Sequence, residues 1–464
     1  MSECYNFITG PIRMPPPSSA WQQQPVAVPP QSVYPAEPPA VSSVLFLIYL
    51  FLAFSRALEF TIQIPKLMLI LGGVSVFAVT VTSLNLSRLA SWTGLLLAAL
   101  TGIMFASTPF SYWRGGSALI MYGWLASLVV FVAGVQVLTT PRLLRRSLVV
   151  VAGATLFLSV FAARAVDSEA DRLALIGSLG NPNDLAAVLL FGLPCWLLIY
   201  VSARGRPLRK LLFGGVIAIQ LFLVLRTGSR GALLTLLLLA GIGLMRLPGA
   251  KKILFLAAAV LFAVIGAAVM PEAVVERYRS YSTEWDPGGE TGSEEAVASA
   301  RLRRTLMTEA VKVTLTHPLL GVGPGQFMLA ANEGLEKRGD RALWLASHNS
   351  FLQISSELGI PALLIYLGIL AHAARVSFRI ARRGEKSLQP LGWCVFLMTI
   401  SYCATSFFLT LAYYAFVPLL AALATSLDRL TLPATIGTPA PPEIRPGSKL
   451  PALAPIGVAG PNRR

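Results

Sequence analysis

Long apolar stretches constrain this chain more than any other feature of its sequence. A helix needs roughly 20 mostly apolar residues to cross a bilayer, because backbone amides and carbonyls cannot stay unpaired in lipid. Apolar residues fill 55% of the 464 positions and charged residues 13%, against about 25% charged residues in soluble domains. We count twelve such stretches, centred near Ile48, Gly73, Ala98, Ser127, Ala154, Gly192, Ala218, Leu238, Val260, Leu364, Thr399 and Leu419. The sequence therefore predicts an all-α polytopic membrane protein with about 12 transmembrane helices.

The positions of the basic residues predict the orientation. A net charge of +16 could by itself suggest binding to nucleic acid or to a membrane surface. The basic residues cluster instead in every second short loop, as the positive-inside rule predicts, so we expect no nucleic-acid partner and both termini in the cytoplasm. These clusters are Arg88, Arg142 to Arg146, Arg204 to Lys210, Arg246 to Lys252, and Arg375 to Lys386.

Proline content and loop length divide the chain. Eighteen of the 32 prolines lie near the ends, so residues 1–40 and 431–464 are predicted to be disordered cytoplasmic tails; no removable signal peptide is expected. Spans 1–9 fill residues 41–270 and spans 10–12 fill residues 348–430. Between them, residues 271–347 form a periplasmic loop far longer than the roughly 2 to 8 residues that join packed helices. Within this loop we expect a mobile stretch at 280–293 and a helix at 299–316 that ends before Pro318.

Two short signatures on the predicted outer side contain polar residues at the ends of spans. The first includes Asn181, which a turn and a helix N-cap explain, with substrate contact as a secondary role. The second runs from Arg226 to Gly231 and includes Arg230. Paired guanidiniums at the bilayer surface suit a diphosphate head group. Snorkelling, or an ion pair to a carboxylate of the loop, is the alternative.

The long loop and its exit contain the other candidate residues. Arg301 would share a helix face with Arg304, while Arg303 would point elsewhere; a solvated charged face is the alternative. His348, next to Asn349 at the outer mouth of a span, could accept a proton from an alcohol, or could merely cap the helix. Glycines at 321, 323 and 325 predict a sharply folded chain that brings the loop back to the membrane, without the features of a phosphate-binding loop. We expect His317 to cap the end of a helix. We expect no catalytic role for His372.

The remaining residues narrow the chemistry. The acidic residues Asp167, Glu169 and Asp171 are predicted to be a solvated turn rather than a metal site. The four cysteines have no metal-binding spacing, so we expect ordinary thiols and no metal or other cofactor. Arginines together with a histidine base favour group transfer from a lipid-linked diphosphate, whose leaving group needs stabilisation of its charge.

At these residues the chain resembles the O-antigen ligase and O-antigen polymerase superfamily of bacterial membrane glycosyltransferases. The resemblance covers roughly residues 41–430, and it rests on five signatures in order: Gly180 to Ala186, Thr227 to Ala232, Ser299 to Arg301, His317 to Gly323, and His348 to Leu352 followed by Glu357 to Gly359. It implies a GT-C-like fold and a metal-independent, inverting transfer on the periplasmic side of the inner membrane. The donor implied is a glycan on undecaprenyl diphosphate. Residue by residue, Arg230 and Arg301 are similar to the arginines that contact the donor diphosphate, and His348 to the histidine beside the acceptor hydroxyl.

The prediction is therefore an inner-membrane glycan transferase. His348, Arg230 and Arg301 are the predicted catalytic residues, and Arg226, Asn181 and Asn349 are predicted to bind substrate. The acceptor would be the lipid A core in a ligase, or the growing glycan in a polymerase of O-antigen or exopolysaccharide; a protein O-glycosylating relative also remains open. Membrane lipid and polysaccharide-assembly proteins are the other expected partners. A solute transporter and a non-catalytic scaffold are the alternatives from other classes.

Overall fold

A computed structural model describes residues 37–61, 67–164, 172–175, 177–279 and 294–431. Several expectations concern residues outside these ranges. They are the disorder of most of both tails, the mobility of 280–293, and the acidic turn with Asp167, Glu169 and Asp171.

The described residues form helices joined by turns and loops, without a strand among them. All twelve predicted span centres lie inside a helix, and seven helices are long and apolar enough to cross a membrane. The all-helical, polytopic architecture is thus confirmed. The helices are α1 (Ala40–Ser55), α2 (Ala57–Thr61), α3 (Leu67–Ser83), α4 (Leu86–Leu89), α5 (Trp92–Ser107), η1 (Thr108–Phe110), α6 (Arg114–Val137), α7 (Pro141–Arg164), η2 (Gly177–Leu179), α8 (Pro182–Ser202), α9 (Pro207–Arg226), α10 (Arg230–Arg246), α11 (Gly249–Val269), α12 (Glu272–Arg279), α14 (Glu294–Thr316), α15 (Phe327–Glu336), α16 (Ser350–Arg383), α17 (Gln389–Ser406) and α18 (Phe416–Thr431).

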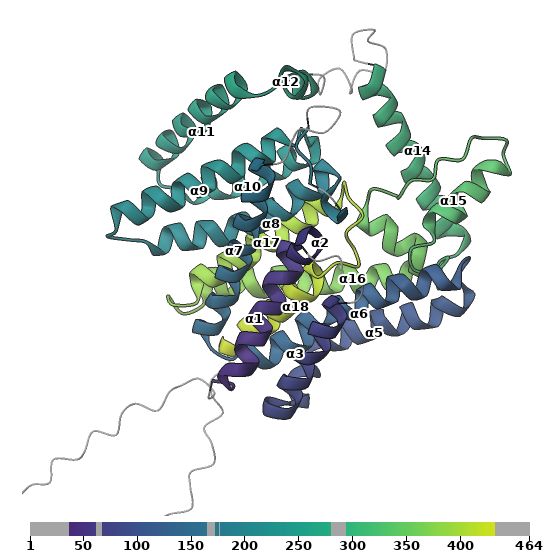
Figure 1. Cartoon of the computed structure of the whole chain (residues 1–464), viewed down its shortest axis with the longest axis horizontal. Helices are drawn as coiled ribbons and strands as arrows, with labels where there is room; N and C mark the ends of the chain where they lie inside the picture. The colour runs from purple at the N-terminus through teal and green to yellow at the C-terminus, as the bar shows by residue number, and fades with distance from the viewer. Residues whose placement is uncertain (1–36, 62–66, 165–171, 176, 280–293, 432–464) are drawn as a thin grey trace, which may run out of the picture.

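The centre of the bundle is built around α16, which packs against α17, α18 and α5. Large aromatic side chains fill this core, among them Trp124, Tyr366 and Tyr402. Two glycines let neighbouring helices approach closely: a Cβ on Gly134 would lie 3.0 Å from the Cβ of Ala422, and one on Gly192 would lie 2.3 Å from Thr155 Cγ2. By contrast, α11 lies at the margin of the bundle (Figure 1), and its apolar side chains are largely exposed. A helix that is apolar all round and unburied suits contact with lipid.

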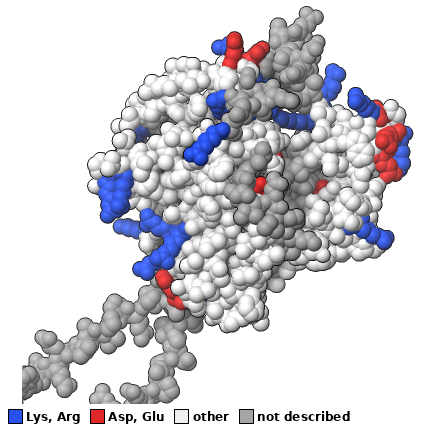
Figure 2. Space-filling view, in the orientation of Figure 1, with Lys and Arg blue, Asp and Glu red and all other residues white. Residues whose placement is uncertain are grey.

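Contacts between loops agree with the predicted alternation of sides. At one end of the bundle, the guanidinium of Arg246 covers the ring of Trp393, and Arg429 Nη2 donates to the carbonyl of Arg88 at 2.7 Å. At the other end, the loop before α8 contacts the turn between α9 and α10, and Tyr112 N–H donates to Val322 O at 3.2 Å. Lys and Arg lie near the margins of the face drawn in Figure 2, and most of its surface is uncharged. Which end faces the cytoplasm stays a prediction.

The long segment between α11 and α16 contains α12, α14 and α15, which form an arc over the upper and right margins of the bundle in Figure 1. The predicted helix at 299–316 is present and ends at Thr316 as expected, but it begins five residues earlier, at Glu294. Residues 294–298 read Glu-Glu-Ala-Val-Ala, and acidic residues near a helix N-terminus together with alanine extend a helix in this direction. Leu306, Ala310 and Val313 are buried, which confirms the predicted apolar stripe.

The glycine run after α14 docks directly onto a break in α16. Gly359 has φ +86° and ψ 173° inside this helix, so the carbonyls one turn earlier become available to other donors. Val322 N–H donates to Ser356 O at 3.0 Å, Gly323 N–H to Glu357 O at 2.9 Å, and Ile360 N–H to Pro318 O at 2.7 Å. A Cβ on Gly321 would lie 2.2 Å from the carbonyl carbon of Glu357. The prediction that these glycines fold the loop sharply back to the bundle is confirmed.

Candidate functional site

A basic cavity of about 410 Å³ lies at the end of the bundle where α12 and α14 pack. Four segments that are distant in sequence build it: the loop before α8 and the start of α8, α12, α14, and the segment that leads into α16. None of the described residues that line it is acidic. They are Arg172, Gly180, Asn181, Pro182, Asn183, Arg277, Leu302, Arg303 and His348.

Two capped helix N-termini shape the cavity. Asn181 is the N-cap of α8, and its Oδ1 accepts from Asn183 N–H at 2.9 Å. Asn349 is the N-cap of α16, and its Oδ1 accepts from Phe351 N–H at 2.9 Å and Leu352 N–H at 3.0 Å. Asparagine is among the best N-caps because its carbonyl oxygen satisfies these otherwise unpaired amides. The capping role expected for Asn181 is confirmed. Asn349, 2% exposed, has the same role.

The turn between α9 and α10 anchors the arginines. Arg172 Nε donates to Thr227 O at 2.9 Å, and Arg277 Nε donates to Gly228 O at 3.2 Å. Arg230 is buried directly behind them, and its Nε donates to the carbonyl of Arg277 at 3.2 Å. A guanidinium is a planar fork with five N–H donors, so a bond from Nε to a carbonyl fixes the direction of the fork. The turn thereby aims two cationic forks at one cavity.

The gathered positive charges shift the pKa values of their neighbours. Burial, and then the charges of Arg277, Arg303 and Arg230, lower the pKa of Arg172 to about 10. Burial and the charge of Arg303 lower the pKa of His348 below its ordinary value. Each shift shows that the charged form is disfavoured here, because it is desolvated and repelled by like charges. The negative charges of a bound polyanion would favour the charged forms of both groups again.

The predicted site residues fall into two groups. His348 and Asn181 line the basic cavity, while Arg230 supports it through the backbone of Arg277. His348 has φ +49°, a conformation that few residues other than glycine adopt. Arg301 is exposed on α14 and does not line the cavity. Asn349 and Arg226 do not line it either. The backbone carbonyl of Arg226 accepts from Leu173 N–H at 3.3 Å.

Sequence reasoning did not single out three arginines of this cavity. Arg172 lies in a loop whose charges are balanced, and Arg277 belongs to no recognisable motif. Arg303 was expected away from the face of Arg301 and Arg304, and the structure bears this out: Arg301 and Arg304 are exposed, whereas Arg303 is half-buried. The buried stripe through Leu306 and Ala310 could have identified Arg303. Arg303 precedes these residues by about one and two helical turns, so it lies on the same inward-facing side of α14.

Metal ligands are not gathered in the described part of the chain. No three His, Cys, Asp or Glu side chains lie together there as they would around a metal ion. Cys195 and Cys394 are buried free thiols. The chemistry available from the described residues is thus that of guanidiniums, amides and an imidazole, and metal independence stays a prediction.

The fold and this cavity together define a polytopic membrane protein with a cavity lined by arginines at one end of its helical bundle. Residues 215–367 match the model of the O-antigen ligase family. The match supports the O-antigen ligase superfamily that the sequence signatures indicated, and with it a membrane glycosyltransferase. It contains Arg230, Arg277, Arg303 and His348, whereas Arg172 and Asn181 lie outside the match. A search of curated proteins found no match.

Proposed function

We propose that the chain transfers a glycan from an undecaprenyl-diphosphate donor to an acceptor hydroxyl on the periplasmic side of the bacterial inner membrane. The observation that carries this proposal is the cavity that Arg172, Arg277 and Arg303 line together with His348. Guanidinium forks bind phosphate oxygens in pairs and retain their charge in a partly desolvated site. The donor's diphosphate would occupy this cavity.

His348 would accept the proton in the transfer step. The acceptor O–H gives its proton to the imidazole while its oxygen forms a bond to the anomeric carbon of the donor glycan. The bond from that carbon to the diphosphate oxygen breaks, and its electron pair leaves with undecaprenyl diphosphate. One such displacement inverts the anomeric centre. Burial and then the charge of Arg303 lower the pKa of His348, which favours the neutral imidazole that can accept a proton.

The arginines would stabilise the leaving group as its charge grows. Arg172, Arg277 and Arg303 are in position to contact the diphosphate, and Arg230 would act as a positioning residue by holding the backbone of Arg277. For Arg301, Arg226 and Asn349 we keep the roles that the sequence suggested, donor contact for the first two and substrate contact for the third. A comparison of Arg301→Ala with Arg303→Ala would separate the roles of these two of the three arginines on α14.

The second candidate is polymerisation in the same superfamily, with a growing glycan in place of the lipid A core as acceptor. The basic cavity would serve both reactions equally, because the donor diphosphate is common to them. A solute transporter is less well supported, since the basic cavity lies at one end of the bundle, whereas transporter sites lie near the bilayer midplane.

Replacement of His348 tests the proposal. Purified His348→Ala, reconstituted in nanodiscs with an undecaprenyl-diphosphate-linked oligosaccharide and rough-type lipopolysaccharide, should lose transfer by about 100-fold or more, the usual range for a lost general base. His372→Ala, which changes a histidine in the second half of α16, is the matched control and should transfer like wild type. Unchanged product from His348→Ala would contradict the assignment.

A further inference from the structure

A second cavity, of about 610 Å³, adjoins the basic one. Its walls come from α1, α6, α15, the start of α16 and the segment that leads into it, the glycine run, and the segment between α17 and α18. Ser347 lines this cavity and the next residue, His348, lines the basic cavity. Consecutive Cα atoms are about 3.8 Å apart, so the two cavities come within one residue of each other at the predicted proton acceptor.

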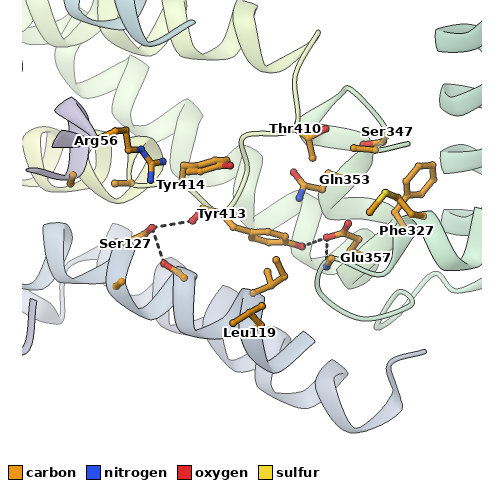
Figure 3. A pocket seen from close by; sticks show the side chains of 18 of the residues that line it. Arg56, Leu119, Ser127, Phe327, Ser347, Gln353, Glu357, Thr410, Tyr413 and Tyr414 are labelled. Carbon is orange, nitrogen blue, oxygen red and sulfur yellow. Dashed lines mark hydrogen bonds between the residues drawn. The ribbon is translucent and has the colours of Figure 1, made fainter. Parts of the chain in front are cut away.

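One wall of this cavity presents buried polar groups. The Oε2 of Glu357 accepts from Tyr413 O–H at 2.7 Å and from Gly325 N–H at 2.8 Å. Gln353 lies one turn away on α16, and its Oε1 accepts from Ala412 N–H at 3.3 Å. Figure 3 shows the ring of Tyr413 reaching across the cavity toward Glu357, with Ser127 bonded to the backbone carbonyl of the same tyrosine at 3.1 Å. These bonds hold a carboxyl, an amide and a phenol in fixed positions.

The other walls are aromatic and apolar, with one cation. Tyr49, Phe327 and Tyr414 line the cavity. The guanidinium of Arg56 lies 4.9 Å from the centre of the Tyr414 ring and pairs with Glu59 at 3.0 Å. Flat apolar faces opposite a few fixed donors and acceptors suit a ligand that has both C–H faces and hydroxyl edges. A hydrocarbon chain would instead bury the carboxyl and the amide without new partners, which costs free energy.

We propose that this cavity binds the acceptor saccharide and presents one of its hydroxyls to His348. The inference rests on the proposed function and adds the acceptor site to it. The sugar's hydroxyls would bond to Glu357, Gln353 and Tyr413, and its C–H faces would pack on the aromatic rings. Arg56, Tyr414 and all of α6 lie outside residues 215–367, so acceptor choice would depend on parts of the chain beyond the matched domain.

Gly123 offers a way to fill the cavity without disturbing its walls. It lies on α6, lines the cavity, and a Cβ built there meets nothing within 4 Å. Gly102 on α5 is a matched control, because it is also an exposed helical glycine with open space around its Cβ, and it does not line either cavity. Leucine at either position also favours the helix relative to glycine, so both variants should fold.

The experiment measures transfer by the full chain in nanodiscs as the donor and the acceptor are varied in turn. Rough-type lipopolysaccharide and, in parallel, the oligosaccharide repeat released from the donor serve as acceptors. Gly123→Leu should raise the acceptor KM by about tenfold or more, which corresponds to roughly 1.4 kcal/mol of lost binding, and should leave the donor KM unchanged. Gly102→Leu should match wild type in both.

An unchanged acceptor KM in Gly123→Leu would overturn the inference, and so would a rise in the donor KM alone, which would assign the cavity to the polyprenyl chain. A wild-type chain that transfers to neither acceptor would count against the proposed function instead. In that case calorimetry with the released oligosaccharide decides: binding to wild type that is lost in Gly123→Leu supports a saccharide site, and equal or absent binding refutes it.

Discussion

His348 illustrates how the surroundings of a single residue set its chemistry. The imidazole shares a cavity with three guanidiniums, and its pKa is lowered by burial first and by the charge of Arg303 second. A lower pKa makes the imidazole a weaker base, but it keeps the ring neutral over a wider range of acid pH. Lower basicity in exchange for a larger neutral fraction favours transfer if the leaving group is already good. The reaction then depends less on the strength of the base than on its being unprotonated.

Arg303→Gln tests this coupling through the pH dependence of transfer. In the proposed mechanism activity requires the neutral imidazole, so we expect it to fall as the pH drops through the pKa of His348. Removal of the neighbouring positive charge raises that pKa, and the acid limb of kcat/KM against pH should therefore move to higher pH. Arg304→Gln, a change at an exposed arginine of the same helix, should leave the limb in place. A limb that does not move in Arg303→Gln would contradict the proposed role of Arg303.

At the scale of an element, the position of α16 depends on the segments that pack against it. Its first two turns bear the N-cap Asn349 and the buried Glu357, and its break at Gly359 receives the glycine run after α14. The backbone bonds across this junction tie the long segment between α11 and α16 to the bundle. They therefore also fix where the residue before the N-cap, His348, lies relative to α14.

Gly359→Ala should destabilise the protein. Gly359 has φ +86°, and an added Cβ would lie 2.4 Å from the carbonyl oxygen of Leu319. Strain of this kind costs about 1 to 3 kcal/mol, so the thermal unfolding midpoint in detergent should fall by several degrees. Gly368→Ala in the same helix meets only an ordinary contact at 3.6 Å, and it should be neutral or slightly stabilising. Equal midpoints for the two variants would show that the junction is not as tight as its contacts indicate.

At the scale of the whole molecule, the two cavities lie where four or five separate segments meet at one end of the bundle. Loops with basic clusters gather at the opposite end, as the contact of Arg246 with Trp393 illustrates. The positive-inside rule predicts that the end with these loop clusters faces the cytoplasm, which gives the bundle a predicted direction across the membrane.

Cysteine labelling from outside the cell tests that direction. Leu319 and Ser387 are both exposed. Leu319 lies beside the break of α16 at Gly359, and Ser387 follows the C-terminal end of this helix. In a background with Cys4 and Cys403 replaced by serine, Leu319→Cys should react with an impermeant maleimide in intact spheroplasts. Ser387→Cys should react only after the membrane is permeabilised. The reverse pattern would place the proposed site on the cytoplasmic side and refute a periplasmic reaction.

The sequence alone determined the helical architecture, because both the apolar stretches and the basic clusters between them are local patterns. It also identified His348, Asn181 and the glycine run, since capping residues and glycines are recognisable in short stretches of chain. Only the tertiary structure brought Arg172 and Arg277 to His348 and selected Arg303 for the cavity, because these side chains come from segments more than 20 residues apart whose packing no short stretch encodes. The second cavity, between α1, α6 and α16, depends in the same way on how the helices pack.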